Sequence, residues 1–215
     1  MPNLFNRISL ETEVQLACLD LEGVLVPEIW IEFSKRTGIP ELARTTRDEP
    51  DYDRLMKGRL ALLERYRLGL PDIQKVIGGM GPLPGAADFL NWLRERFQVV
   101  ILSDTFYEFA MPLMKQLGYP ALFCHKLVVD ETGFVRDYVL RLPEQKRESV
   151  KAFKAINFKT IAAGDSYNDT AMLAEAHAGI LFRPPQNVID EFPQYPVTRS
   201  YDELAAAFEN ASRRI

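Results

Sequence analysis

The sequence predicts an α/β fold in which a Rossmann-like parallel sheet core carries an inserted helical cap. Short apolar runs alternate with segments of helical periodicity, a pattern typical of a parallel sheet covered by helices on both faces. One long stretch, residues 28–80, breaks this alternation, because it has helical patterns but no strand pattern. A length of 215 residues is sufficient for such a core with an inserted subdomain.

The elements of the core follow from the apolar runs. The expected central strands are residues 14–21, 98–103, 160–165 and 179–182. Helices with apolar residues on one stripe are expected at residues 86–96, 147–156, 169–177 and 201–211. Two further strand patterns, residues 122–129 and 134–142, flank a short turn and predict a hairpin-like pair.

The cap is expected to contain three helices, at residues 28–37, 51–66 and 72–77. Glycine and proline mark their ends, as Gly38 does for the first. Because a crossover between parallel strands needs only a dozen or more residues, this block is read as an insertion. The expected domains are therefore a core of residues 14–27 and 81–215, a cap of residues 28–80 and an N-terminal extension of residues 1–13.

Composition narrows the classes of function. The net charge of −4 argues against general nucleic-acid binding, and no apolar run approaches the length of a membrane span. Cys18 and Cys124 are the two cysteines of the chain, which offers no disulfide framework and fits a reducing compartment. The N-terminus lacks the apolar stretch of a signal peptide. We therefore expect a cytoplasmic protein without membrane or nucleic-acid partners.

Two acidic segments stand where predicted strands end. The first, DLEGVL at residues 20–25, contains Asp20 and Glu22, and the second, GDSYND at residues 164–169, contains Asp165 and Asp169. Ionised carboxylates are costly to bury unless they are paired or bind a metal. Two such clusters therefore suggest a shared cation site, with Asp165 and Asp169 as ligands of a hard ion such as Mg²⁺. Read alone, each segment is also compatible with a simple turn or a helix N-cap.

The chemistry of phosphate esters fits these residues. A carboxylate can attack phosphorus to form an aspartyl-phosphate, while a second carboxyl group protonates the leaving oxygen. Asp20 and Glu22 are the candidates for these two tasks. Ser103, at the end of a predicted strand, and Lys146, before a predicted helix, could hold phosphate oxygens. Neither residue by itself indicates phosphate chemistry. The order in which these two residues and the two acidic segments follow one another along the chain does indicate it.

That order resembles the haloacid dehalogenase superfamily of aspartyl-phosphate phosphatases, and the resemblance extends from residue 14 to about residue 182. The helical cap resembles the subgroup that contains phosphoserine phosphatase. The resemblance implies that Asp20 is the nucleophile and a metal ligand, and that Glu22 is the acid/base and a ligand through its carbonyl. It also implies that Ser103 and Lys146 hold phosphate. Asp165 is then a metal ligand, and Asp169 a ligand or a partner of the ligands.

The same resemblance implies a substrate. Glu28 matches the residue that binds the ammonium of phosphoserine, and Arg59 matches the residue that binds its carboxylate. Asn168 matches a position that contacts the phosphate or the substrate. An anion and a cation together suit a zwitterionic amino acid, and Arg grips a carboxylate through two hydrogen bonds. The simpler alternative for Arg59 is that it lies on a solvated face of its helix. The simpler alternative for Glu28 is that it is an acidic residue at a helix N-terminus. Related enzymes are often dimers, so a homodimer is possible.

Two departures point to a particular branch of this subgroup. Most phosphatases of the superfamily have Asp where this chain has Glu22, and ordinary phosphoserine phosphatases have a glycine pair where it has Asp104 and Thr105. Both match the members that also transfer phosphate to homoserine, so Asp104 is expected beside the substrate. A phosphatase for another small metabolite and a non-catalytic regulatory domain remain the alternatives.

Overall fold

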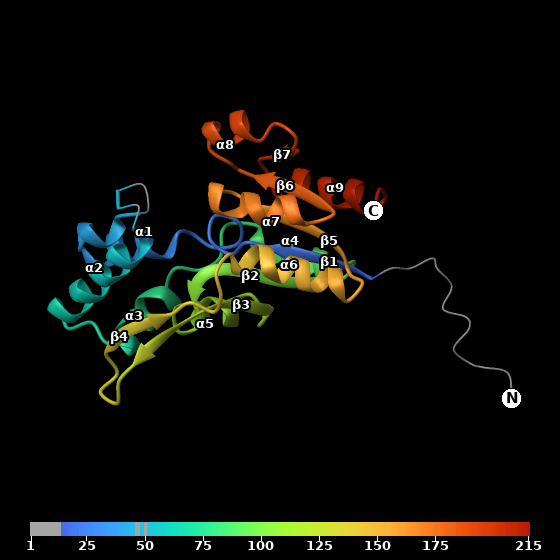
Figure 1. The fold of residues 1–215 in the computed structure, drawn as a ribbon. Coiled ribbons are helices and arrows are strands. Elements are labelled where there is room, and N and C mark those ends of the chain that lie inside the picture. The colour runs from blue at the N-terminus through green and yellow to red at the C-terminus, as the bar shows by residue number, and fades with distance from the viewer. Residues whose placement is uncertain (1–13, 46–47, 50) are drawn as a thin grey trace, which may run out of the picture.

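The computed structural model describes residues 14–45, 48–49 and 51–215, and it contains a sheet in the order β4-β3-β2-β1-β5-β6-β7 (Figure 1). All neighbouring strands pair in parallel except β3 and β4, which are antiparallel. The predicted α/β class is therefore confirmed. The strands are β1 (Gln15–Leu19), β2 (Gln98–Phe106), β3 (Ala121–Val129), β4 (Val135–Val139), β5 (Lys159–Gly164), β6 (Ala178–Phe182) and β7 (Val197–Thr198).

Helices cover both faces of this sheet. One face packs against α4 (Ala86–Arg94), α5 (Tyr107–Gln116) and α9 (Tyr201–Ser212), and the other against α6 (Gln145–Ala155) and α7 (Thr170–Glu175). Strand β1 shows why both faces need cover, because its alternate side chains belong to two different apolar clusters. Ala17 and Leu19 lie in one cluster, and Leu16 and Cys18 in the other.

The stretch between β1 and α4 is helical, with α1 (Ile29–Thr37), a 3₁₀ helix (Pro40–Ala43), α2 (Tyr52–Arg65) and α3 (Leu70–Gly78). In Figure 1 these helices lie at the opposite end of the molecule from β6, β7 and α9. Helix α2 packs on β4 and α3 packs on α5, so their buried side chains are continuous with those of the sheet. The division into a core and a cap of residues 28–80 stays a prediction, and residues 1–13 lie outside the described residues.

Several element boundaries differ from the prediction. Strand β2 runs to Phe106, beyond the predicted end at Ser103, and its register with β3 shifts between Leu102 and Phe106. The predicted hairpin extends the main sheet, since β3 pairs with β2. Helix α6 begins at Gln145, so that Lys146 lies in its first turn and not before the helix. Helix α8 (Gln186–Glu191) and strand β7 were not predicted.

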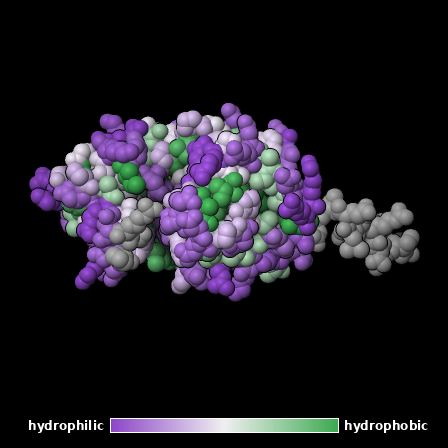
Figure 2. Space-filling view, turned by 90° about the horizontal axis from the view of Figure 1, so that it is seen from above, coloured by the Kyte–Doolittle hydropathy of each residue, from purple (hydrophilic) through white to green (hydrophobic). Residues whose placement is uncertain are grey.

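The surface is mostly hydrophilic on the face that Figure 2 shows, where hydrophobic side chains form only a few small groups. None of the helices in the described part of the chain is both long and apolar enough to cross a bilayer.

Candidate active site

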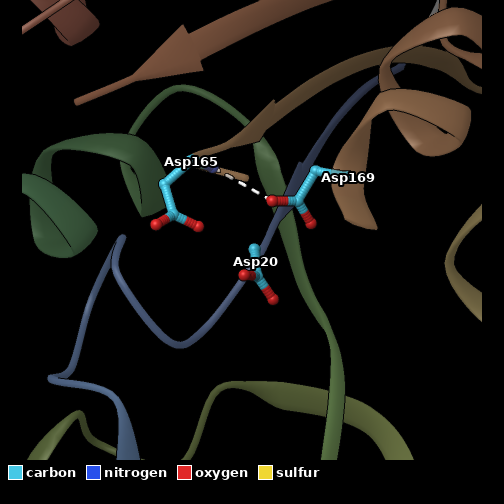
Figure 3. Close-up of side chains that lie close together, drawn as sticks. All are labelled: Asp20, Asp165 and Asp169. Carbon is cyan, nitrogen blue, oxygen red and sulfur yellow. Dashed lines mark hydrogen bonds between the residues drawn. The ribbon is translucent and has the colours of Figure 1, made fainter. Parts of the chain in front are cut away.

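Three carboxylates meet at the carboxyl ends of two neighbouring parallel strands. Asp20 follows β1, and Asp165 follows β5, which pairs directly with β1. Asp169 is the last residue of a short 3₁₀ helix, and each of the three residues offers an oxygen within 4.8 Å of the others (Figure 3). Strand order reverses direction at β1, and ligands of open α/β sheets bind in the crevice at such a point.

Asp169 is positioned by the loop in which it lies. The side chain is fully buried, and its Oδ2 accepts hydrogen bonds from the backbone N–H groups of Asp165, at 3.0 Å, and Ser166, at 3.1 Å. The Ser166 hydroxyl donates to the same oxygen. Oδ1 is left to face Lys146, so Asp169 links the second acidic segment to the centre of the site.

Lys146 joins the two acidic segments. Its buried Nζ donates to Oδ1 of Asp20 and to Oδ1 of Asp169, each at 2.8 Å. Burial by itself would lower the pKa of Lys146, but the negative charges of Asp169, Asp20 and Asp104 together raise it well above the usual value. The ammonium is therefore charged at any physiological pH and lies where two carboxylates need a counter-ion.

One lysine does not balance the three carboxylates. Burial raises the pKa of Asp20 well above its usual value, and the charge of Asp169 raises it further. Burial and the charge of Asp169 likewise raise the pKa of Asp165 to about 7. These carboxyl groups resist ionisation because too little positive charge lies near them. Such a cluster of oxygen ligands fits a hard divalent cation such as Mg²⁺.

Glycines allow the two segments to approach so closely. Gly23 has φ of +75°, and a Cβ added there would lie 2.2 Å from Oδ2 of Asp165. At Gly164 an added Cβ would lie 2.3 Å from Cβ of Asp169. Neither position has room for a side chain while the acidic residues keep their places.

Glu22 lies beside the acidic cluster and is directed to the start of α1. Its Oε2 accepts a hydrogen bond from the backbone N–H of Ile29 at 2.8 Å. Burial, and then the neighbouring charge of Glu28, raise the pKa of Glu22 to about 8. The side chain can therefore hold a proton at neutral pH, as a general acid must.

The irregular end of β2 presents Ser103 and Asp104 to the site. Ser103 is buried, and its Oγ accepts from the backbone N–H of Thr105 at 3.3 Å. The Gln145 amide donates to the carbonyl oxygen of Ser103 and to Oδ1 of Asp104. Asp104 also lies 3.6 Å from Nζ of Lys146. Bulged strands commonly redirect side chains beside active sites, which is the effect here.

His125 is a neighbour of the site that the sequence did not reveal. Strand β3 places it opposite Phe106 of β2, with Nε2 3.7 Å from Oδ1 of Asp104. Its Nδ1 accepts from the backbone N–H of Arg141 at 3.0 Å, so a neutral ring carries its proton on Nε2, toward Asp104. Burial lowers the pKa of His125, which keeps the ring neutral.

The wall of a cavity of about 150 Å³ includes all the predicted site residues except Asp169, which is fully buried. Arg59 is buried, stacks over Trp30 at 4.5 Å and donates to the carbonyl of Arg44 at 2.6 Å. Burial lowers its pKa to about 10, so it remains a cation. The remaining wall includes five residues that the sequence did not single out. Four lie on α1 and α2, and the fifth lies between the 3₁₀ helix and α2: Trp30, Ile31, Tyr52, Leu55 and Thr45. The predicted residues of the wall are Asp20, Glu22, Glu28, Arg59, Ser103, Asp104, Lys146, Asp165 and Asn168.

Comparisons with known proteins identify the family. A family model for haloacid dehalogenase-like hydrolases matches residues 14–177. A phosphoserine phosphatase of Pseudomonas syringae pv. tomato is 60% identical over 100% of this chain and 90% of its own length. The phosphoserine phosphatase ThrH of Pseudomonas aeruginosa is 61% identical over 94% of this chain and 98% of its own length.

A solved structure of a substrate-bound phosphoserine phosphatase complex has the same fold, with a TM-score of 0.74 at 19% identity, and the match covers 93% of this chain and 99% of that one. The expected family is thus confirmed by a model that matches most of the chain and by two relatives of nearly equal length. The chain belongs to the haloacid dehalogenase-like hydrolases.

Proposed function

We propose that this chain is a Mg²⁺-dependent phosphoserine phosphatase that works through an aspartyl-phosphate and can also transfer the phosphoryl group to homoserine. The observation that carries the proposal is the ion-paired centre in which Lys146 links Asp20 and Asp169 beside Asp165. The names of two relatives at about 60% identity support the substrate.

The first step uses Asp20 and Glu22. A carboxylate oxygen of Asp20 attacks phosphorus, the bond between phosphorus and the serine oxygen breaks, and Glu22 delivers its proton to that oxygen. A pKa of about 8 supports this role, since Glu22 then enters the reaction protonated. In the second step the ionised Glu22 takes a proton from water, or from the hydroxyl of an acceptor, which attacks the aspartyl-phosphate.

Lys146 and Ser103 hold the phosphoryl oxygens. Asp20, Asp165, Asp169 and the carbonyl of Glu22 are the residues that would hold Mg²⁺. When bound, the ion neutralises charge on the phosphoryl group and on the carboxylates around it. Lys146 is already directed to Asp20, so it needs no rearrangement to serve the phosphoryl group that Asp20 receives.

The substrate's amino-acid part is assigned to Glu28 and Arg59, with Asn168 and Asp104 at the same cavity. Nε of Arg59 is buried and has no hydrogen-bond partner among the described residues. A buried donor in this state favours a ligand that accepts from it, and a carboxylate does so with charge as well as geometry.

Substitution of Arg59 tests the assignment of the substrate. Arg59→Ala should raise the KM for phosphoserine by roughly tenfold or more, because a charge-assisted contact is lost. The KM for p-nitrophenyl phosphate, which has no carboxylate, should change little. An equal effect on both substrates would show that Arg59 supports the fold and not phosphoserine recognition.

The nucleophile is tested by Asp20→Asn, which should abolish turnover because an amide oxygen does not form the aspartyl-phosphate. Residual activity near the wild-type rate would exclude Asp20 as the attacking group. Thermal unfolding of the variant, measured in parallel, separates loss of chemistry from loss of structure.

The acceptor is tested by incubating the enzyme with phosphoserine and Mg²⁺, with and without homoserine, and measuring free phosphate and phosphohomoserine together. Glu22 and Asp104 are the residues that favour transfer in this proposal. If phosphate release is unchanged by millimolar homoserine and no phosphohomoserine forms, the transfer part of the proposal fails while the phosphatase part stands.

A further inference from the structure

The guanidinium of Arg59 is a buried cation that neutral groups hold in place. The residue is 8% exposed, and its Nη2 donates to the backbone carbonyl of Arg44 at 2.6 Å. Nη1 lies 3.7 Å from the sulfur of Met56, and the ring centroid of Trp30 lies 4.5 Å from Cζ. Among the described residues, none of these contacting groups is a carboxylate. Arg59 is therefore a nearly buried positive charge that no contacting side chain neutralises.

Neutral support suits a side chain that must bind an anionic ligand. A protein carboxylate in contact with the guanidinium would occupy the donors that a substrate carboxylate needs. A backbone carbonyl and an aromatic face stabilise the same cation without cancelling its charge. Among aromatic side chains tryptophan attracts a cation most strongly, and the attraction grows where water is excluded, as it is around the buried pair of Trp30 and Arg59.

The Trp30 ring is itself fixed by packing. It contacts the rings of Phe33 and Phe109 edge to face, with centroids 6.2 Å and 5.1 Å away. Trp30 and Phe33 lie on α1, whereas Phe109 lies on α5, which packs on the sheet. Arg59 lies on a third helix, α2, and an arginine side chain has many rotamers. The ring therefore gives the Arg59 guanidinium a surface that is fixed relative to the sheet.

We infer that Trp30 is a positioning residue for substrate recognition, whose ring holds the charged guanidinium of Arg59 ready for the carboxylate of an amino-acid substrate. The inference rests on the proposed function, in which Arg59 binds the carboxylate of phosphoserine. Trp30 acts through Arg59 and not on the phosphoryl group. Its removal should therefore weaken only the binding of ligands that carry a carboxylate.

Steady-state kinetics with two substrates test this role. The KM for phosphoserine and for p-nitrophenyl phosphate is measured in Mg²⁺ for wild type, Trp30→Leu and Trp30→Phe. Trp30→Leu keeps an apolar side chain but loses the ring, so the KM for phosphoserine should rise about tenfold and that for p-nitrophenyl phosphate less than twofold. Trp30→Phe restores a ring and should bring the KM for phosphoserine back to within about threefold of wild type. If Trp30→Leu does not fold, Trp30→Met replaces it, because the flexible methionine adapts to irregular spaces.

The chain offers a matched control in Trp92. Its ring centroid lies 4.7 Å from Cζ of Arg96, so it forms a comparable pair with a guanidinium, and it is not part of the cavity wall. Trp92→Leu should leave both KM values unchanged. Thermal unfolding of every variant is measured in parallel. A rise in the KM for phosphoserine in Trp92→Leu as large as in Trp30→Leu would overturn the inference, because loss of stability alone would then explain the effect.

A double-mutant cycle separates positioning from direct contact with the substrate. If Trp30 acts through Arg59, adding Trp30→Leu to Arg59→Ala should lower kcat/KM for phosphoserine by less than a further twofold. Effects that multiply, or an equal rise in KM for both substrates in Trp30→Leu, would overturn the inference. A selective effect of Arg59→Ala would in that case still support the proposed substrate. If Arg59→Ala itself leaves the KM for phosphoserine unchanged, the assigned carboxylate contact and this inference fail together.

Discussion

At the scale of single residues, Gly23 determines whether the two acidic segments can meet. Its positive φ turns the chain after Glu22, and its missing side chain leaves the space that Asp165 occupies. Lys146 then links Asp20 to Asp169 across that junction. The site therefore depends on one residue with no functional group as much as on the residues that carry charge.

Gly23→Ala should cost more than about 2 kcal/mol of unfolding free energy and most of the activity, because backbone strain adds to the overlap with Asp165. Gly38→Ala is the matched control. Its φ is also positive, at +69°, but nothing lies within 4 Å of the added Cβ, so about 1 kcal/mol and little activity should be lost. Urea unfolding and phosphatase assays measure both. Equal losses in the two variants would contradict the role given to Gly23.

At the scale of elements, α2 connects the cavity to the hairpin. It carries Arg59, and its first turns supply Tyr52 and Leu55 to the cavity wall. On its other side the helix packs on β4, where Asp53 accepts from the Tyr138 hydroxyl at 2.9 Å. Order at the start of α2 should therefore affect substrate binding.

Asp51 caps α2 by accepting from the backbone N–H of Arg54 at 3.1 Å, and Ser200 caps α9 by accepting from Glu203 at 3.2 Å. Either residue changed to Ala should lower the unfolding free energy by about 1 kcal/mol, since each loses one helix cap. Only Asp51→Ala should raise the KM for phosphoserine, because α2, unlike α9, carries residues of the cavity wall. A similar KM in both variants would show that α2 tolerates fraying at its start.

At the scale of the whole molecule, the active site concentrates negative charge at one edge of the sheet. Carboxyl groups from β1 and from the loop after β5 are buried together around Lys146. The pKa values of Asp20 and Asp165 are raised, so the folded protein without a cation holds protons that the unfolded chain has already released. Stability, protonation and cation binding are therefore linked.

In EDTA, the unfolding free energy should fall as pH rises from about 5 to about 8. Glu22 has its pKa raised from 4.5 to about 8 and Asp165 from 3.8 to about 7, so across this window the unfolded state binds fewer protons than the folded state. The expected loss is about 1 kcal/mol or more, since each unit of pKa shift corresponds to about 1.4 kcal/mol. Urea unfolding at several pH values measures it.

Added Mg²⁺ should stabilise the protein more at pH 8 than at pH 5, because its ligands must be ionised. Asp165→Asn should lose most of this effect, whereas Asp137→Asn, in the exposed part of the hairpin, should keep it. Stabilisation by Mg²⁺ that is independent of pH would argue against a site made of these carboxylates.

The sequence by itself determined the fold class, the family and the residues whose spacing is local. Asp20 with Glu22, and Asp165 with Asp169, lie close together because a strand end and one turn hold each pair, so their motifs could be read without coordinates. The alternation of apolar runs likewise predicted the parallel sheet, since burial on both faces requires it.

Tertiary structure alone decided which distant segments meet. His125 approaches Asp104 only because β3 pairs with β2 in a shifted register, and Trp30 meets Arg59 only because α1 and α2 share one side of the cavity. Gln145 donates to Ser103 and Asp104 from the first turn of α6, which begins two residues before its predicted start. Register and helix packing depend on contacts between residues far apart in the chain, and no local pattern in the sequence encodes them.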